Sequence, residues 1–197
     1  MVTPFDIGPP LRRQGKRRRA HRPYRQGDLD GLCGVYSVIN ALRAVCPELD
    51  AKLSARLFRH LVRCLRGRAR EPLNVITGGI GRPTLGQLLK IAIAFVDRSL
   101  GVIVRARQLS EPTRSAKRVD RLWRELSDVL SPTSVAIISV EGRMSHWTVV
   151  TRIGAKHLFL LDSGNLKRFR RTSCTVGWAE GLYSIAPGEV VIVARED

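Results

Sequence analysis

The sequence predicts an α+β protein in which helices come first and an antiparallel sheet follows. Apolar residues recur at helical spacing in four segments between residues 33 and 130. From residue 134 onward, short segments rich in Val, Ile and Thr alternate with turns. Helices followed by strands are typical of the α+β class. With 197 residues, 44% of them apolar, the chain is long enough for one domain with its own core.

The first helix is predicted to begin at Cys33, directly after a polar loop that contains glycines. The residues that recur at the spacing of a buried helix face are Val35, Val38, Ile39, Leu42 and Val45. Backbone N–H groups and the helix dipole stabilise an anion at a helix N-terminus, and the thiolate is the reactive form of cysteine. Cys33 is therefore predicted to be a nucleophile, and the alternative is a small core residue.

Three further helices and a short strand are predicted before residue 131. The second helix has a leucine face and, on its other side, a basic stripe that consists of Arg56, Arg59, Arg63 and Arg66. We expect this stripe to be a solvated face, with anion binding as the alternative. Thr84 is predicted to cap a helix that runs to about residue 96, a strand follows at residues 102–106, and the last helix covers residues 114–130. Residues 71–83 form a loop.

The second part of the chain is predicted to form strands at residues 134–140, 146–153, 158–162, 166–171 and 190–194. Turns at residues 141–143 and 154–156 join the first three of them. A turn at 154–156 puts residue 162 opposite about residue 148, so His146 and Asp162 come within one pair of each other. A carboxylate that ends an apolar strand face needs a partner, which His146 supplies. The alternatives are a structural histidine and an aspartate that only forms a turn.

Three short segments resemble the papain-like cysteine peptidase superfamily. The first is Gln26 with Asp30-Gly31-Leu32-Cys33-Gly34 and Asn40-Ala41, the second is Ser145-His146-Trp147-Thr148-Val149-Val150, and the third is Leu160-Leu161-Asp162-Ser163-Gly164. The sequence is most similar to compact branches such as bacterial double-glycine leader peptidases and SUMO or ubiquitin proteases. The resemblance implies a papain-like fold, in which the cysteine helix packs against a sheet that carries the catalytic base.

The resemblance also implies roles for four residues. Cys33 is the expected nucleophile, His146 the base, Asp162 the group that orients the imidazole, and Gln26 an oxyanion donor beside the Cys33 amide. Gln26 lies seven residues before Cys33, one more than is usual in the superfamily. Peptide or isopeptide hydrolysis is the expected reaction, with no cofactor and no metal. Glutamine deamidation and acyl transfer use the same residues and stay open as alternatives.

The net charge of +17 predicts an anionic partner. Residues 1–25 carry +7 and are predicted to form a flexible basic arm ahead of a peptidase domain at residues 26–197, which carries the remaining +10. Such a charge favours polyanions. We expect an acidic or ubiquitin-like protein substrate, with nucleic acid as a further partner through the arm. The alternative from another class is a non-catalytic nucleic-acid-binding protein on the same fold.

Cysteine spacing and hydropathy limit the remaining classes of protein. Cys33, Cys46, Cys64 and Cys174 show neither a C-x-x-C pair nor metal-ligand spacing, which indicates a reduced protein without structural zinc. No apolar run is long enough for a membrane span, and no apolar stretch of a signal peptide follows the N-terminal charges. We expect a cytoplasmic protein, with export as an effector as the alternative. The other histidines, His21, His60 and His157, are expected on the surface.

Overall fold

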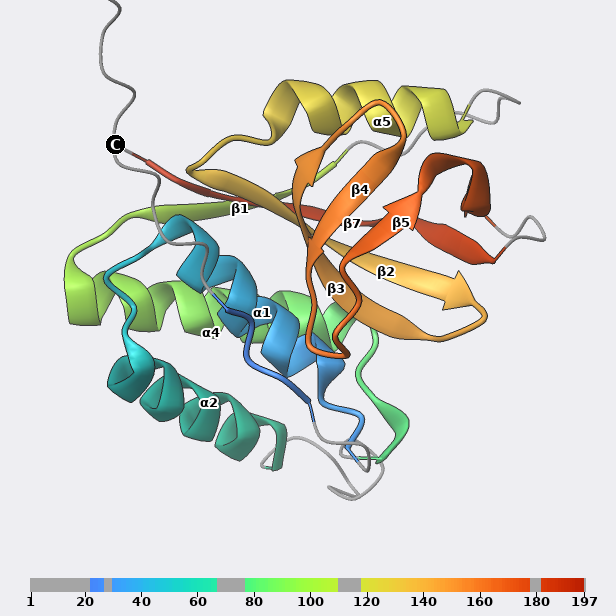
Figure 1. Cartoon of the computed structure of the whole chain (residues 1–197). Coiled ribbons are helices and arrows are strands. Elements are labelled where there is room, and N and C mark those ends of the chain that lie inside the picture. The colour runs from blue at the N-terminus through green and yellow to red at the C-terminus, as the bar shows by residue number, and fades with distance from the viewer. Residues whose placement is uncertain (1–21, 27–29, 67–76, 110–117, 178–181, 197) are drawn as a thin grey trace, which may run out of the picture.

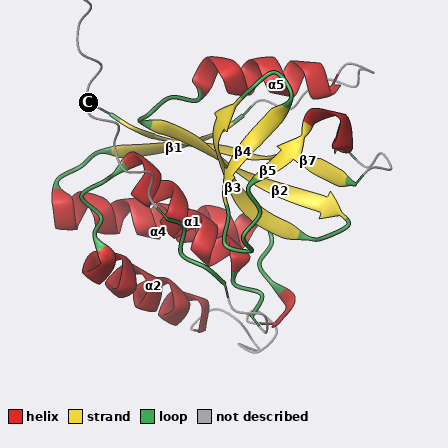
Figure 2. Cartoon of the chain, viewed as in Figure 1, coloured by secondary structure: helices red, strands yellow, loops and turns green. Residues whose placement is uncertain are grey.

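The structure is a computed structural model that describes residues 22–26, 30–66, 77–109, 118–177 and 182–196. Its helices and sheet form layers (Figures 1 and 2). One face of the sheet is covered by α1 (Cys33–Val45), with α2 (Ala51–Arg66) and α4 (Arg82–Leu100) packed around it, and the other face is covered by α5 (Arg118–Val129). The predicted α+β class is confirmed.

The sheet contains seven strands in the described part of the chain. They are β1 (Val104–Gln108), β2 (Ser134–Gly142), β3 (His146–Ile153), β4 (His157–Leu161), β5 (Arg168–Arg170), β6 (Cys174–Val176) and β7 (Tyr183–Arg195). The strand order is β1-β7-β2-β3-β4-β5, and β6 pairs with β7 away from this path. All described pairs are antiparallel except β6 with β7, which is parallel.

Two hydrophobic cores lie on the two faces of the sheet. Strand β2 is buried from residue 134 to residue 140, because Val135 and Ile137 face the core with α1 while Ala136 and Ile138 face the core with α5. Helix α1 is enclosed by the sheet, α2 and α4, which explains its almost continuous burial. The N-terminus of this buried helix carries Cys33, so the packing of α1 fixes the position of the thiol.

Several predicted boundaries were wrong for identifiable reasons. Thr84 does not cap α4: the helix begins at Arg82 after Gly81, with Pro83 in its first turn, where a missing N–H costs nothing. It continues to Leu100, and Gly101 ends it with a left-handed backbone (φ 64°). The strand predicted at residues 102–106 begins two residues later, and residues 114–117 of the last predicted helix lie outside the described residues.

Two strand segments were not predicted. Strand β6 has only three residues, too few for a recognisable alternation. Strand β7 begins at Tyr183, seven residues before the predicted start, and the Pro187-Gly188 pair in its middle has the composition of a turn. The register between β7 and β2 changes between Ile138 and Val140. This irregularity in the pairing accommodates Pro187 and Gly188 within one long strand.

Residues 22–26 lie against α1. The buried Asn40 side chain accepts the N–H of Tyr24 (2.8 Å) and donates to its carbonyl (3.1 Å). Arg43 donates to the Arg22 carbonyl (2.9 Å), and its guanidinium lies 4.3 Å from the centre of the Tyr24 ring. Residues 22–25, which were expected in the basic arm, thus form part of the folded body. The rest of that arm, residues 1–21, lies outside the described residues.

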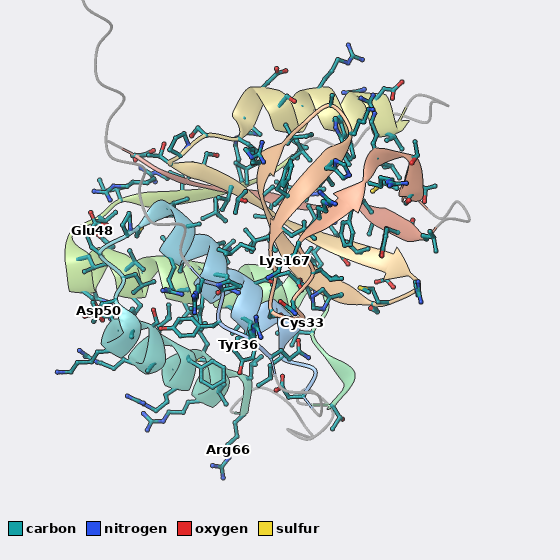
Figure 3. All side chains as sticks on the ribbon, in the orientation of Figure 1. Cys33, Tyr36, Glu48, Asp50, Arg66 and Lys167 are labelled. Atoms are coloured by element: carbon teal, nitrogen blue, oxygen red, sulfur yellow. The ribbon has the colours of Figure 1, made fainter. Side chains whose placement is uncertain are left out.

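Helix α2 is the outer helix of its layer. Its leucine face is buried at Leu57, Leu61 and Leu65, while the four arginines of the basic stripe are exposed. Arg66 points away from the body of the molecule (Figure 3). Within the described residues, no helix has the length and apolar character that crossing a membrane requires.

Candidate active site

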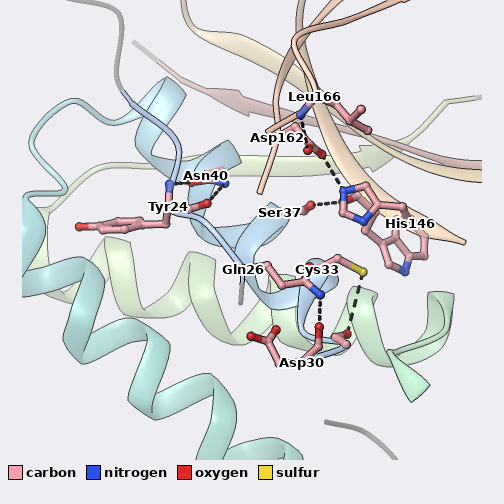
Figure 4. Close-up of polar contacts among 11 residues, drawn as sticks. Tyr24, Gln26, Asp30, Cys33, Ser37, Asn40, His146, Asp162 and Leu166 are labelled. Atoms are coloured by element: carbon pink, nitrogen blue, oxygen red, sulfur yellow. Dashed lines mark hydrogen bonds and ion pairs between the residues drawn. The ribbon is translucent and has the colours of Figure 1, made fainter. Parts of the chain in front are cut away.

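His146 and Asp162 contact each other directly. His146 Nε2 lies 2.7 Å from Asp162 Oδ1 (Figure 4). Strand β4 pairs with β3 so that Leu161 lies opposite Val149, and the next residue, Asp162, therefore follows opposite Thr148, as predicted. The Asp162 side chain is fully buried, and its second oxygen accepts the Leu166 N–H (3.0 Å). Both carboxylate oxygens thus have a partner, as a buried charge requires.

The environment favours the charged form of Asp162. Burial raises the pKa of its carboxyl, but hydrogen bonding from His146, the Thr148 hydroxyl and the Leu166 N–H holds this pKa below its ordinary value of 3.8. The Thr148 hydroxyl is a weak contributor, because it has no partner with full hydrogen-bond geometry among the described residues. Asp162 is therefore an anion at neutral pH, which suits it to hold an imidazolium.

The pKa of His146 is raised from 6.5 to about 9. Burial lowers this pKa, but hydrogen bonds with Asp162 and with Cys33, together with the negative charge of these two groups, outweigh burial. Because Nε2 faces Asp162, Nδ1 is the ring nitrogen that remains for Cys33. The three predicted catalytic side chains are thus brought together, and the imidazole lies between the other two.

Cys33 is the first residue of α1 and is 7% exposed. Its Sγ lies 3.9 Å from the Gly31 carbonyl, and the preceding loop is closed by a hydrogen bond from the Leu32 N–H to Asp30 Oδ1 (3.1 Å). The N–H groups of the first helical turn have no intrahelical acceptor, and the Cys33 N–H is one of them. Negative charge at Cys33 is favoured by this position.

Gly34 permits a close approach between α1 and β3. A Cβ at this position would lie 2.5 Å from the Ile80 side chain and 3.3 Å from Trp147. Trp147 in turn donates from Nε1 to the Ile80 carbonyl (2.8 Å), and its own carbonyl accepts the Ser37 hydroxyl (2.8 Å). These contacts fix the helix that carries the thiol against the strand that carries the imidazole.

Gln26 lies beside the loop that follows Asp162. Its main-chain N–H donates to the Ser163 carbonyl (3.1 Å), and its side-chain Nε2 donates to the Asp30 carbonyl (Figure 4). Its Oε1 is buried without a hydrogen-bond partner in the part of the chain that is described. One amide hydrogen of Gln26 is thus used inside the Cys33 loop and the second is left for another acceptor. The oxyanion role of Gln26 stays a prediction.

The loop after Asp162 contains features that sequence reasoning missed. A Cβ at Gly164 would lie 3.2 Å from Asp162 Oδ2 and 3.8 Å from the His146 ring, so the absence of a side chain leaves room for their contact. Asn165 has a left-handed backbone (φ 69°) and accepts a hydrogen bond from Arg25 (3.2 Å). The Asp-Ser-Gly-Asn composition signals a turn, but not that this turn supplies the Leu166 N–H to the carboxylate.

Other loops and histidines lie around or away from this site. Gly79 (φ 79°) lies beside the Cys33 loop, because a Cβ there would be 3.5 Å from the Gly31 carbonyl. The 141–145 turn is closed by a hydrogen bond from Ser145 to Glu141 (3.1 Å), and residues 71–76 lie outside the described residues. His60 and His157 belong to α2 and β4 and are not part of the site, and His21 is not described.

A cavity of about 380 Å³ lies between residues 24–25, α1 and α2. Its wall is mainly apolar and aromatic, with Tyr36 and Phe58 in contact (ring centroids 5.4 Å apart), and Arg25 and Arg59 contribute its charge. Tyr36 follows Cys33 by about one helical turn. The nearest cavity residue on α1 therefore lies about one helical turn from the thiol.

Among the described residues, no group of three or more His, Cys, Asp or Glu side chains could hold a metal ion. The arrangement has the parts of nucleophilic catalysis, namely a thiol, a base and a carboxylate that orients the base.

A scan against models of known protein families finds no match to this chain, and no curated protein matches it either.

Proposed function

We propose that this chain is a thiol hydrolase of papain-like fold, which cleaves a peptide or isopeptide bond with Cys33, His146 and Asp162. The observation that carries the proposal is the position of His146 between a fully buried carboxylate and the thiol, with a pKa raised to about 9 by both. A purely structural histidine needs only one of these partners. An imidazole held between a carboxylate and a thiol is suited to accept the proton of the thiol and to return it.

In the proposed reaction, Cys33 Sγ forms a bond to the substrate carbonyl carbon, and the carbonyl electron pair moves to its oxygen. The C–N bond then breaks as His146 donates its proton to the leaving amine, which gives a thioester on Cys33. Water attacks the thioester while His146 accepts a proton, and the acid product and free thiol follow. Asp162 holds the imidazole in one orientation throughout, without itself accepting the proton.

The transient oxyanion needs donors on the side of α1. The Cys33 N–H is available because it belongs to the first turn of the helix. We assign the second donor to the remaining N–H of the Gln26 amide, whose other hydrogen goes to the Asp30 carbonyl. Two such donors near the developing charge stabilise the transition state more than the ground state.

The same acyl-enzyme step serves glutamine deamidation and acyl transfer, which differ only in the leaving group and in the molecule that attacks the thioester. Hydrolysis of a peptide or isopeptide bond is the version that we favour for a chain with an acidic partner expected from its charge of +17. The cavity beside Tyr36 would receive an apolar substrate side chain, with Arg25 and Arg59 suited to a carboxylate at its rim.

The proposal is tested without a substrate by the rate of iodoacetamide alkylation at each cysteine, measured by mass spectrometry from about pH 5 to about pH 9. Cys33 is only 7% exposed, whereas Cys64 on α2 is half-buried, so exposure alone predicts that Cys64 reacts first. We expect the reverse order below pH 7. Cys46 and Cys174 are internal references, because burial raises the pKa of each thiol to about 11.

The matched variants are His146→Gln and His60→Gln. Loss of His146 is expected to abolish the advantage of Cys33 below pH 7, while His60→Gln leaves it unchanged because His60 lies on α2, outside the site. If Cys33 reacts like an ordinary thiol in the native chain, or if both variants behave alike, the proposed mechanism is wrong. A positive result justifies a search with peptide and ubiquitin-like probes that carry a C-terminal electrophile.

A further inference from the structure

Strands β3, β4 and β5 present a group of basic side chains on one face of the sheet, at the end far from Cys33. We call this group the basic face. It consists of Arg152, His157, Arg168 and Arg170 on the strands, Lys156 in the β3–β4 turn, and the aromatic residue Phe159 among them. No described helix lies in front of β4 and β5 in the view of Figure 1, whereas α5 covers the opposite side.

The pairing of the strands brings these residues to the same side. Phe159 lies opposite Arg152 on β3 and opposite Arg168 on β5, and His157 lies opposite Arg170. Residues that pair directly share a sheet face. The alternate residues Leu158 and Phe169 face the core with α5. The arginines of β5 are therefore directed away from that core.

A bulge in β3 is what turns Arg152 to this side. The register with β4 shifts between Val150 and Arg152, so that Arg152 pairs with Phe159 and Ile153 pairs with Leu158. Without the extra residue, Arg152 would pair with Leu158 and point into the core with α5. Bulges commonly redirect a side chain in this way. The bulge therefore gives this strand end an exposed arginine next to an aromatic ring.

Arg152 and Phe159 form a cation–π pair on this face. The guanidinium carbon of Arg152 lies 3.7 Å from the centre of the Phe159 ring. The edge of the ring packs on Gly154, where a Cβ would lie 3.4 Å from Phe159. A guanidinium plane stacked on an aromatic ring is itself a platform for a nucleic-acid base.

The described strands of the basic face carry an excess of positive charge. Residues 146–177 contain six Lys or Arg and one acidic residue, Asp162, which is bound to His146. Among the described residues, none of the cations of the basic face forms an ion pair, whereas the adjacent Arg171 pairs with Asp120 (2.6 Å). Burial together with the charges of Arg168, Arg170 and Lys156 lowers the pKa of His157, which reflects this positive field.

A cavity of about 420 Å³ opens beside the same residues, between the β3–β4 turn and the segment after β5. Lys156, His157 and Arg170 line it, and Thr172 adds a hydroxyl. Cations and hydroxyl donors around a hollow of this size suit a phosphate group.

We propose that the basic face binds single-stranded nucleic acid, with one base stacked on the Arg152–Phe159 pair and adjacent phosphates at Arg168, Arg170 and the Lys156 cavity. An acidic protein would use the cations but would not need the Arg152–Phe159 pair. A duplex keeps its bases stacked inside, so the platform offers it nothing. The combination of an aromatic surface with unpaired cations on an open sheet face therefore favours an unpaired strand.

The test uses the full chain and a fluorescein-labelled oligothymidylate of about twelve nucleotides, a length within the usual site sizes of single-strand-binding folds. Binding is followed by fluorescence anisotropy at increasing salt. We expect Phe159→Ala to weaken binding roughly tenfold or more, through loss of base stacking. Phe159→Leu, which keeps the apolar volume, is expected to weaken binding similarly and guards against a folding defect. Arg168→Ala with Arg170→Ala should reduce the slope of log affinity against log salt by about 1.4.

The control for net charge is the pair Arg56→Ala with Arg63→Ala on the basic stripe of α2, which removes the same two charges elsewhere. Its effect should stay below about threefold at 0.1 M salt, where charges farther away than about 10 Å are screened. Oligonucleotide binding should also raise the pKa of His157 in an NMR titration, because phosphates offset the cations that lower it.

The outcomes decide between the proposal and its competitors. Equal losses in the α2 variant and the β5 variant would mean that binding follows net charge alone, and the proposal would be refuted. A duplex or a poly-glutamate of equal charge that binds as tightly as the single strand would also overturn it, and so would unchanged affinity in both Phe159 variants. None of these outcomes bears on the alkylation of Cys33.

Discussion

The proton on His146 offers the most direct test of the geometry around Asp162 and Cys33. Its pKa is raised to about 9, so the imidazole stays protonated throughout the neutral range. Two-dimensional NMR of the imidazole nitrogens reports the pKa of each of the four histidines in the chain. The signal of His146 is identified by its absence from His146→Gln, and His157, whose pKa is lowered by burial and three cations, provides an internal reference.

Substitution of the two neighbours separates their effects. Burial is the largest single influence on His146 and lowers its pKa, while Asp162 and then Cys33 raise it. We therefore expect Asp162→Asn to lower the pKa more than Cys33→Ser does. The double variant should bring it to 6.5 or below, because burial then acts nearly alone. The signal of His157 should not move in any of these variants.

The same difference predicts how stability depends on pH. A histidine with a folded-state pKa above 6.5 stabilises the fold fully below pH 6.5, and this contribution is lost as the pH rises through about 9. The difference between 6.5 and about 9 corresponds to roughly 3 kcal/mol, and a side chain that is only 12% exposed is little screened by solvent. The free energy of unfolding in urea should fall by up to this amount relative to His146→Gln over the same pH range.

Two results would refute this reasoning. The first is a His146 in the native chain whose pKa is near 6.5 and does not change in Asp162→Asn. This result would mean that the 2.7 Å contact with Asp162 does not stabilise the protonated imidazole. The second is a double variant whose His146 pKa stays near 9, which would mean that neither neighbour is responsible for it. Either result would also remove the main support for the proposed thiol hydrolase.

Two further substitutions test how α1 is held in place. Gly34→Ala should lower the free energy of unfolding by about 1–3 kcal/mol, because the new methyl group would overlap Ile80. The control is Gly86→Ala on α4, where a Cβ meets nothing within 4 Å. This control should raise the free energy of unfolding by up to about 1 kcal/mol. Equal urea midpoints for these two variants would contradict the close approach of α1 and Ile80. Asn40→Ala should cost about 1–3 kcal/mol and speed hydrogen exchange at Tyr24, whose N–H it bonds, and unchanged exchange there would contradict the docking of residues 22–26.

The spacing of apolar residues and the position of a turn were sufficient to predict α1 and the hairpin of β3 and β4, which carries His146 and leads to Asp162. The apolar spacing after Cys33 defines α1 because one helix face packs into a core, and the helix begins where the polar loop ends. A short turn at residues 154–156 sets the register of β3 with β4 to within one residue, so the approximate position of residue 162 near residue 148 follows from the sequence, while the bulge before Arg152 decides the final register.

The remaining features depend on contacts between residues far apart in the sequence. Nothing near Gly34 indicates that Ile80 packs against it, and nothing near Tyr24 indicates that Asn40 binds its backbone. The basic residues of β3 and β5 were visible as charge, but not as one face. Only the bulge before Arg152 and the pairing of two hairpins decide which side each residue occupies. Periodicity cannot detect a single inserted residue.

The candidate active site and the basic face share strand β3 but lie at different ends of it. His146 begins the strand and Arg152 follows six residues later, a separation of roughly 20 Å at about 3.3 Å per residue. A nucleotide stacked on the Arg152–Phe159 pair therefore does not contact the thiol, and the effect of nucleic acid on the proposed thiol chemistry would be to localise the chain. It follows that saturating amounts of an oligonucleotide too short to span this separation should leave the alkylation rate of Cys33 unchanged. Releasing that oligonucleotide with salt should not alter the rate either. A slower reaction on oligonucleotide binding would show that the two surfaces overlap, against the extended geometry of β3.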